Sequence, residues 1–211
     1  MTGVQTCALP IFKAVLDGQV PVTLLDTYDE ERAFAADDNL GHSTRATDFI
    51  TPKSRSSTRL RNAVLELART EPFARPLVNS GRLSTPTPYV HSSLNTADAD
   101  VFEGRMRPGT NCADAPINVD GQPGWLLNQL GQGFVLLSFG PASAVTVAGH
   151  TTQVLQVGHD ILDSKGLVQQ RYDGQPGTVY LIRPDQHVAA RWRRFDAAAV
   201  EQALRRALTL N

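Results

Sequence analysis

The sequence predicts an α/β fold in which an N-terminal helical segment is followed by a domain built from one sheet and the helices packed on it. Three observations support this prediction. Apolar residues recur at helical spacing over residues 21–40, and residues 134–139 (FVLLSF) form a continuous apolar run, as in a central strand that is buried on both faces. Residues 178–192 alternate and turn like a β-hairpin.

The first residues of the chain do not look biological. Residues 1–11 (MTGVQTCALPI) resemble the read-through translation of a common sequencing-adapter oligonucleotide. We therefore expect the natural chain to start near Phe12 or Lys13 and to be the back part of something larger. Residues 1–11 are set aside from fold prediction, as a tag would be. The alternative, a short leader peptide, lacks a basic n-region and a small-residue cleavage site.

Composition excludes several classes of partner. The formal net charge of the 211 residues is -1, which does not favour nucleic acid, and Arg191 and Arg193 near the C-terminus are predicted to lie on a solvated face. No apolar run approaches the roughly 18–20 residues of a transmembrane helix, so no membrane partner is expected. Outside residues 1–11, Cys112 is the only cysteine. A reducing, cytoplasmic location is therefore predicted.

Residues 12–70 are predicted to be helical. One helix covers about residues 21–40, and Gly41 is its predicted stop. Ser57 or Thr58 is the predicted cap of a following helix. Its apolar stripe comprises Leu60, Val64, Leu67 and Ala68.

Proline, glycine and small polar residues then interrupt every periodic pattern. Residues 71–103 read as an extended linker, because a structureless stretch of this length is unusual inside one compact domain. The predicted organisation is therefore an artefactual segment at 1–11, a helical region at 12–70, this linker, and an α/β domain at 104–211.

The elements of residues 104–211 follow in order. We expect a short helix at 125–130, strands at 134–139 and 153–157, a hairpin with a turn at 184–186, and a last helix capped by Asp196. The hairpin late in the chain, followed by a helix with a clean apolar face, is typical of a thioredoxin-like α/β sandwich.

A thioredoxin-like fold raises the question of a redox dithiol, and the sequence answers it negatively. There is no C-x-x-C pattern, and the position after the first core strand reads Gly140-Pro141-Ala142-Ser143. Cys112 lies ahead of the sheet and is predicted to be inert or solvent-facing, because disulfide exchange needs a thiolate.

The sequence patterns of dinucleotide-binding, metal-binding and acid-catalytic sites are not met either. Gly131 and Gly133 begin a G-x-G pattern, but it precedes a strand, whereas dinucleotide loops follow one. The five histidines show no metal-ligand spacing, and His187 is predicted to be a solvated residue at the strand edge. The acid-rich residues 26–32 fit helix-dipole and i,i+4 pairing better than acid catalysis. No catalytic, cofactor-binding or metal-binding residue is therefore predicted in this chain.

Several motifs, in the right order, resemble one family. Residues 24–32 (LLDTYDEER) resemble the helix that ends the flavin-binding domain of class A FAD-dependent aromatic monooxygenases. Residues 47–54 and 73–84 resemble the branch related to 3-(3-hydroxyphenyl)propionate hydroxylases. Residues 107–109 (RPG) with 114–116 (DAP), and residues 181–192 (LIRPDQHVAARW), resemble the thioredoxin-like C-terminal domain of these enzymes.

This resemblance implies an NAD(P)H-using, FAD-dependent monooxygenase that hydroxylates a phenolic aromatic substrate. It also implies that residues 12–70 end a flavin-binding domain whose G-x-G-x-x-G fingerprint precedes this sequence, so no flavin or catalytic residue can be transferred to this chain. The chain alone is expected to be inactive and to serve structural or dimerisation roles, because the cofactor carries the chemistry.

The matching residues are expected to have structural roles. Tyr28, Glu31 and Arg32 are predicted to tie their helix to the missing flavin domain. Arg183 and Asp185 are predicted to shape the hairpin turn. Trp192 is predicted to pack under the last helix.

Two other hypotheses compete with the monooxygenase fragment. A stand-alone, redox-inactive thioredoxin-like interaction module would bury its helical apolar residues on its own sheet domain. A fragment would instead leave them uncovered, namely Leu25, Tyr28, Leu60, Val64 and Leu67. A thiol peroxidase relative would depend on Cys112.

Overall fold

The computed structural model describes residues 12–78, 81, 85–130 and 133–210. Residues 1–11, which the sequence analysis attributes to an adapter, lie outside the described residues. The chain divides into two compact units, one formed by Met1–Glu31 with Pro88–Asn211 and the other by Arg32–Thr87. We name the first the sheet unit and the second the helical unit. No helix among the described residues is both long and apolar enough to cross a membrane.

The long helix α2 (Leu24–Ile50) corrects the expected stop at Gly41, because it continues for nine residues beyond that glycine. A glycine inside a helix costs only about 1 kcal/mol relative to alanine, so it does not end a helix by itself. The first residue after α2 that strongly disfavours helix is Pro52, which pushes the residue before it out of the helical region.

The cap of the next helix, α3 (Arg55–Thr70), also differs from the prediction. Ser54, and neither Ser57 nor Thr58, occupies the N-cap, with its hydroxyl accepting a hydrogen bond from the Ser57 N–H at 3.1 Å. A short 3₁₀ helix η1 (Pro72–Ala74) and α4 (Arg75–Val78) then stand where extended chain was expected, and both contact α3. Pro72 favours this start because its fixed φ suits a first helical position.

The sheet unit is organised around a four-stranded sheet in the order β6 (Gln153–Gln156), β3 (Val135–Ser138), β7 (Val179–Ile182), β8 (Val188–Trp192). β3 pairs parallel with β6, while β7 pairs antiparallel with both β3 and β8. All four residues of β3 and of β7 are buried, as the continuous apolar runs predicted.

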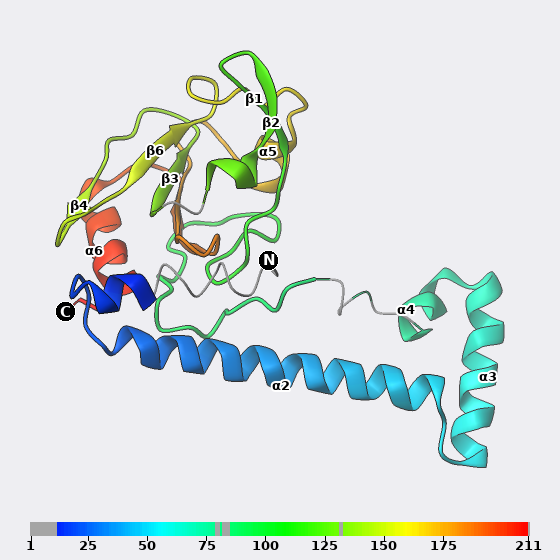
Figure 1. The fold of residues 1–211 in the computed structure, drawn as a ribbon. Helices are drawn as coiled ribbons and strands as arrows, with labels where there is room; N and C mark the ends of the chain where they lie inside the picture. The colour runs from blue at the N-terminus through cyan, green and yellow to red at the C-terminus, as the bar shows by residue number, and fades with distance from the viewer. Residues whose placement is uncertain (1–11, 79–80, 82–84, 131–132, 211) are drawn as a thin grey trace. The chain divides into compact units, whose positions relative to one another are not determined.

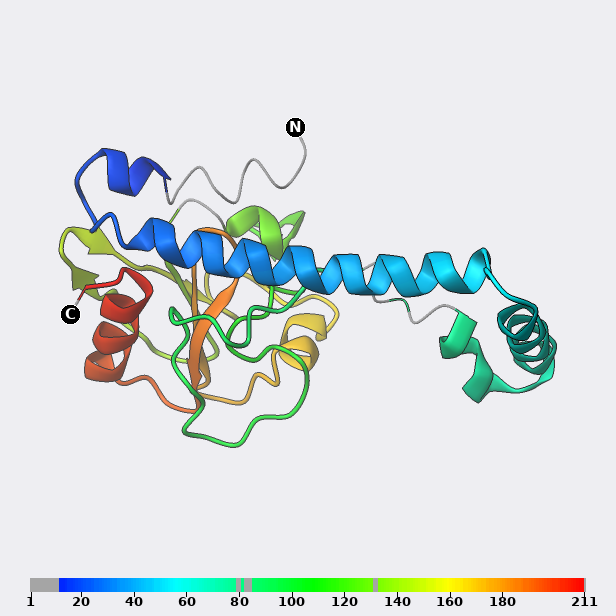
Figure 2. The ribbon, with the colours of Figure 1, turned by 90° about the horizontal axis from the view of Figure 1, so that it is seen from below.

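Each face of this sheet carries its own apolar cluster. One cluster joins Leu136 and Leu181 to α6 (Ala197–Ala207) and to the start of α2. The other joins Leu137 and Tyr180 to α5 (Leu167–Arg171). Figures 1 and 2 show the resulting layers, with α6 and α5 on opposite sides of the sheet. The predicted thioredoxin-like α/β sandwich is confirmed.

The N-terminal cap of the last helix and the packing of Trp192 against it agree with the sequence predictions. Asp196 caps α6 and accepts hydrogen bonds from the N–H groups of Ala198 and Ala199. Trp192 is half-buried and packs against the cluster that contains Val200 and Leu204, as predicted.

The structure before β3 differs from the prediction in one element. The expected short helix at 125–130 is present as the 3₁₀ helix η3 (Leu126–Gln129), but Trp125 belongs to β2 (Gln122–Trp125), which pairs with β1 (Pro116–Val119) in a hairpin that was not predicted. Asp120 and Gly121 form the two-residue loop, both at positive φ (49° and 77°). An Asp-Gly pair in a two-residue loop is a strong signal for such a hairpin.

A second hairpin, β4 (Thr146–Val147) with β5 (His150–Thr151), lies within the connection between the parallel strands β3 and β6. It occupies the chain after Gly140–Ser143, where a thioredoxin-like enzyme would carry its reactive thiol.

Candidate functional site: buried ion pairs along the terminal hairpin

Charged side chains are buried along the β7–β8 hairpin, and this is the most unusual chemistry of the sheet unit. Arg183, Asp185, His187 and Arg191 are all less than a tenth exposed. Buried charges are rare unless they are paired, so their partners decide what the hairpin does. The pairs form two networks, one at the turn and one at the far end of β8.

The turn network is centred on Arg183, which is 3% exposed. Its guanidinium donates to both carboxylate oxygens of Glu31, Nη1 to Oε1 at 2.6 Å and Nη2 to Oε2 at 2.9 Å. Nη2 also donates to Oδ2 of Asp185 at 2.6 Å. This bidentate geometry is the strong form of an arginine–carboxylate pair. Arg183 and Asp185 therefore shape the turn, as predicted.

The pKa values at the turn follow from this pairing. Burial alone would raise the pKa of Asp185, but the positive charge of Arg183 and the hydrogen bonds to the carboxylate outweigh it, and the pKa of Asp185 lies well below its usual range. Burial would lower the pKa of Arg183, and the two carboxylates raise it instead. Arg183 and Asp185 are therefore both ionised at neutral pH.

Glu31 corrects an expectation. It was predicted to face a missing flavin domain, together with Tyr28 and Arg32. Instead its carboxylate is occupied by Arg183 and by the hydroxyl of Ser92, which donates to Oε1 at 2.6 Å. Tyr28 is half-buried and meets the ring of Phe12 edge-on, with 5.4 Å between the ring centroids. The roles predicted for Tyr28 and Arg32 remain predictions.

His187 is not the solvated edge residue that the sequence suggested. Its ring stacks on Tyr89 with 4.8 Å between the centroids, and Nδ1 lies 3.0 Å from the backbone oxygen of Asp185. The physical reason is that β8 is covered at its outer edge: the N–H of Gly109 donates to Val188 and the N–H of Val188 donates to Thr110. The chain around residues 89–110 therefore shields this hairpin.

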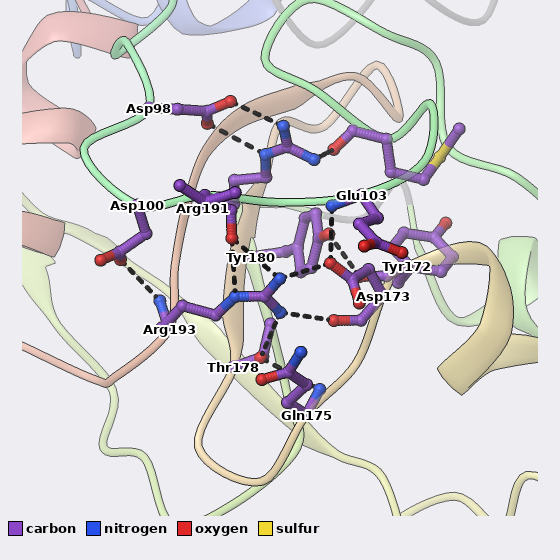
Figure 3. A network of polar contacts seen from close by, with 12 residues as sticks. Asp98, Asp100, Glu103, Tyr172, Asp173, Gln175, Thr178, Tyr180, Arg191 and Arg193 are labelled. Carbon is purple, nitrogen blue, oxygen red and sulfur yellow. Dashed lines mark hydrogen bonds and ion pairs between the residues drawn. The ribbon is translucent and has the colours of Figure 1, made fainter.

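The second network lies at the end of β8, shown in Figure 3. Arg191 donates from Nε and Nη2 to the two oxygens of Asp98 at 2.9 and 2.6 Å. Arg193 donates from Nη1 to the backbone oxygen of Asp173 at 2.7 Å and pairs with its carboxylate. The ring of Phe102 meets both guanidinium groups, with 4.3 Å from its centroid to Arg191 and 3.8 Å to Arg193.

These contacts overturn the solvated face predicted for Arg191 and Arg193. Both arginines fasten the segment around residues 98–103 to the hairpin, and each also stacks on an aromatic face. Burial would lower the pKa of Arg191, but its bond to Asp98 raises it. Neither guanidinium is a free cation for an outside ligand.

Cys112 is buried, at 3% exposed, so the solvent-facing alternative is wrong. Burial raises the pKa of its thiol to about 12, which leaves almost no thiolate at neutral pH. A peroxidase that depends on Cys112 is therefore disfavoured. In the described part of the chain, no group of three or more metal-ligating side chains is placed to hold an ion.

Two motif residues show why their identity matters. Gly109 has a φ of 87°, and a Cβ there would lie 2.3 Å from the backbone oxygen of Tyr89, so only glycine fits. Asp114 accepts hydrogen bonds at Oδ1 from the N–H groups of Ala115 and Leu127, at 2.9 and 3.1 Å. Both residues hold chain segments together, which is a structural role.

Comparison with known proteins identifies the family of the terminal part of the chain. The family model described as aromatic-ring hydroxylase, C-terminal, matches residues 105–210. The chain belongs to this family. Among curated proteins, no significant match is found.

Solved structures similar to this aromatic-ring hydroxylase domain agree in fold. They include the flavin-dependent monooxygenase PieE with FAD and substrate (18% identity, TM-score 0.74), aklavinone-11 hydroxylase with FAD and aklavinone (23%, 0.60), and RebC with reduced flavin (22%, 0.65). They cover 99%, 94% and 97% of this chain, which spans only 44%, 38% and 40% of theirs. At these identities the likeness establishes the fold alone.

Among residues 12–78, 85–130 and 133–210, no strand–loop–helix arrangement fits the phosphates of FAD. A dinucleotide-binding loop joins the end of a strand to the start of a helix. The G-x-G pattern at 131–133 precedes β3, and residues 131 and 132 lie outside the described residues. The charged groups of both hairpin networks are already paired with one another.

Proposed function

We propose that this chain is the C-terminal part of an FAD-dependent monooxygenase that hydroxylates a phenolic aromatic substrate. The observation that carries the proposal is the family match over residues 105–210. PieE and aklavinone-11 hydroxylase, which share the fold, were solved with FAD and are more than twice as long as the matched part. In the complete enzyme, NAD(P)H supplies the electrons and FAD carries the oxygen chemistry.

The proposed role of the chain itself is structural. Residues 12–70 would close the flavin-binding domain, residues 71–103 would be the linker, and residues 104–211 would be the terminal domain. The Glu31–Arg183 pair supports this role, since it fixes the start of α2 to the terminal domain. A homodimer and a cytoplasmic location belong to the same proposal, and the free, buried thiol of Cys112 is compatible with a reducing compartment.

Exposed apolar side chains of the helical unit favour a fragment over a stand-alone module. Of the five residues that a fragment was expected to leave uncovered, Leu60 is 66% exposed and Leu67 is 43% exposed, whereas Val64, Leu25 and Tyr28 are half-buried. No residue of α3 is buried. A self-sufficient module should have covered these leucines. Exposed leucines on one helix are typical of an interface, and we propose that the flavin-binding domain covers them.

The reading frame upstream of the Lys13 codon tests the proposal. An independent clone should show an open frame that continues back to a G-x-G-x-x-G segment between a strand and a helix. The restored protein should then bind FAD, and the 211-residue chain should not. A genuine start codon at Met1, together with a promoter, would overturn the proposal in favour of the interaction module.

The finer parts of the proposal need separate measurements on the restored protein. Oxidation of NADH and of NADPH, each with and without 3-(3-hydroxyphenyl)propionate, tests the reductant and the substrate class. Light scattering coupled to size-exclusion chromatography tests the homodimer. A monomer would remove the dimerisation role and leave the proposed oxygenase activity intact.

A further inference from the structure

Asp-Gly steps can rearrange without an enzyme, and this chain contains them at Asp17-Gly18, Asp120-Gly121 and Asp173-Gly174. The glycine N–H nitrogen attacks the side-chain carboxyl carbon of the aspartate, and one water leaves as a succinimide ring closes. When one water adds back and opens the ring at the aspartate's main-chain carbonyl, the product is isoaspartate. The net change is an isomerisation, so no oxidant or reductant is required.

The folded structure restrains two of these steps. The Gly18 N–H donates to the oxygen of Val15 at 3.0 Å, and the Asp17 carboxylate pairs with Lys13. A nitrogen engaged in a hydrogen bond and a carboxylate engaged in an ion pair must both be released before the ring can close.

The step at Asp173 is restrained more strongly. The Gly174 N–H donates to the oxygen of Gln169 at 2.9 Å. The Asp173 carboxylate pairs with Arg193 and accepts the N–H of Glu103 at 2.8 Å, as Figure 3 shows. Gly174 also lies so close to the ring of Phe139 that a Cβ would overlap it, so this segment has little room to move.

The step at Asp120 has none of these restraints. Asp120 and Gly121 are exposed and form the tip of the β1–β2 hairpin, between the paired residues Val119 and Gln122. Within the described residues, neither the Asp120 carboxylate nor the Gly121 N–H takes part in a recorded hydrogen bond. No atom lies within 4 Å of the position a Gly121 Cβ would take.

We propose that Asp120 is the site of spontaneous isoaspartate formation in this protein, and hence the site that a protein-repair carboxyl methyltransferase would recognise. The modification changes the fold locally, because isoaspartate inserts one extra carbon into the backbone of a two-residue loop. Loop length sets the register of a hairpin. The pairing of β1 with β2, and the bonds between Asn118 and Leu162 beside it, are the contacts placed at risk.

The experiment ages the folded 211-residue chain in ¹⁸O-labelled water near neutral pH, where a small fraction of the aspartate carboxyl is still protonated, and maps isoaspartate by peptide mass spectrometry. Isoaspartate is expected at Asp120 about ten-fold faster than at Asp17 or Asp173, since releasing one hydrogen bond in the folded state slows a reaction by about that factor. Ageing in urea should bring the rates of all three steps close together. Equal rates in the folded chain, or a faster rate at Asp173, would overturn the proposal.

Two variants control the chemistry. Asp120→Glu should abolish the product at this position, since the longer side chain does not form the five-membered ring. Asp120→Asn keeps a residue that favours this turn and should react faster than aspartate, with release of ammonia. If Asp120→Asn stays unmodified while the folded chain is intact, the turn blocks ring closure and the proposal fails.

Discussion

The two units of this chain differ in how far they bury their apolar side chains. The sheet unit buries its apolar residues in two clusters and pairs its buried charges internally, as Glu31 and Arg183 show. The helical unit leaves leucines of α3 exposed to solvent. A unit with a closed core folds on its own contacts, whereas a unit with an open apolar face needs a partner. This contrast is what the proposed fragment role predicts, with the helical unit completed by the flavin-binding domain.

The largest effect is expected at Arg183. Arg183→Ala leaves the carboxylates of Glu31 and Asp185 buried without their positive partner. We expect this change to lower the unfolding free energy by about 3–5 kcal/mol. Urea denaturation measures this loss. The matched control is Arg194→Ala, an exposed arginine two residues after β8, which should change stability by less than about 0.5 kcal/mol. Equal losses of unfolding free energy in the two variants would show that the buried ion pairs of Arg183 stabilise the sheet unit no more than an exposed arginine does.

Trp192→Ala tests the packing of the hairpin on α6. A fully buried indole would cost about 3–5 kcal/mol on truncation, and half burial reduces the expected loss to about 2 kcal/mol. Urea denaturation with tryptophan fluorescence from Trp125 reports the change. A loss well below 1 kcal/mol would mean that Trp192 does not support the last helix.

Acid should lower the unfolding free energy of the sheet unit by protonating Asp185. Because its folded pKa lies below the unfolded value of about 3.9, its contribution is present above about pH 4 and is lost as the pH falls towards the folded pKa. The contribution removed over this range is about 2 kcal/mol. Asp185→Asn should flatten the fall in unfolding free energy below pH 4, and parallel curves for the two proteins would contradict the account.

The smallest effect is expected at Cys112. In a Cys7→Ser background, a thiol reagent should leave Cys112 almost unmodified at neutral pH, since the thiol is buried and its pKa is raised to about 12. Addition of urea should make it react fully. Rapid modification of the folded chain would show that the sheet unit opens near α5, which would weaken its description as a closed domain.

The sequence predicted the parts of the fold that depend on local pattern. The strands at β3 and β7 follow from continuous apolar runs, and α6 follows from its cap at Asp196. The β1–β2 hairpin was missed although the Asp120-Gly121 signal was present, because the following apolar residues read as a helix. α2 runs past the predicted stop at Gly41, because one glycine costs a helix little and no proline follows before Pro52.

The ion pairs could not be predicted from local pattern at all. Glu31 and Arg183 are 152 residues apart in the chain, and Arg191 and Asp98 are 93 apart. A side chain that pairs across such a separation gives no periodic signal, so Arg191 read as a solvated cation. The motifs of the family contained Glu31, Arg183 and Asp185, but only the fold shows that these three meet.

Hydrogen exchange of the 211-residue chain tests the contrast between the two units most directly. The account predicts strong protection of the amides of β3, β7 and α6, and fast exchange throughout α3, because α3 has no buried residue to stabilise it. In the restored enzyme the amides of α3 should become protected. Protection of α3 equal to that of β7 in the 211-residue chain would contradict the account and show that the helical unit needs no partner.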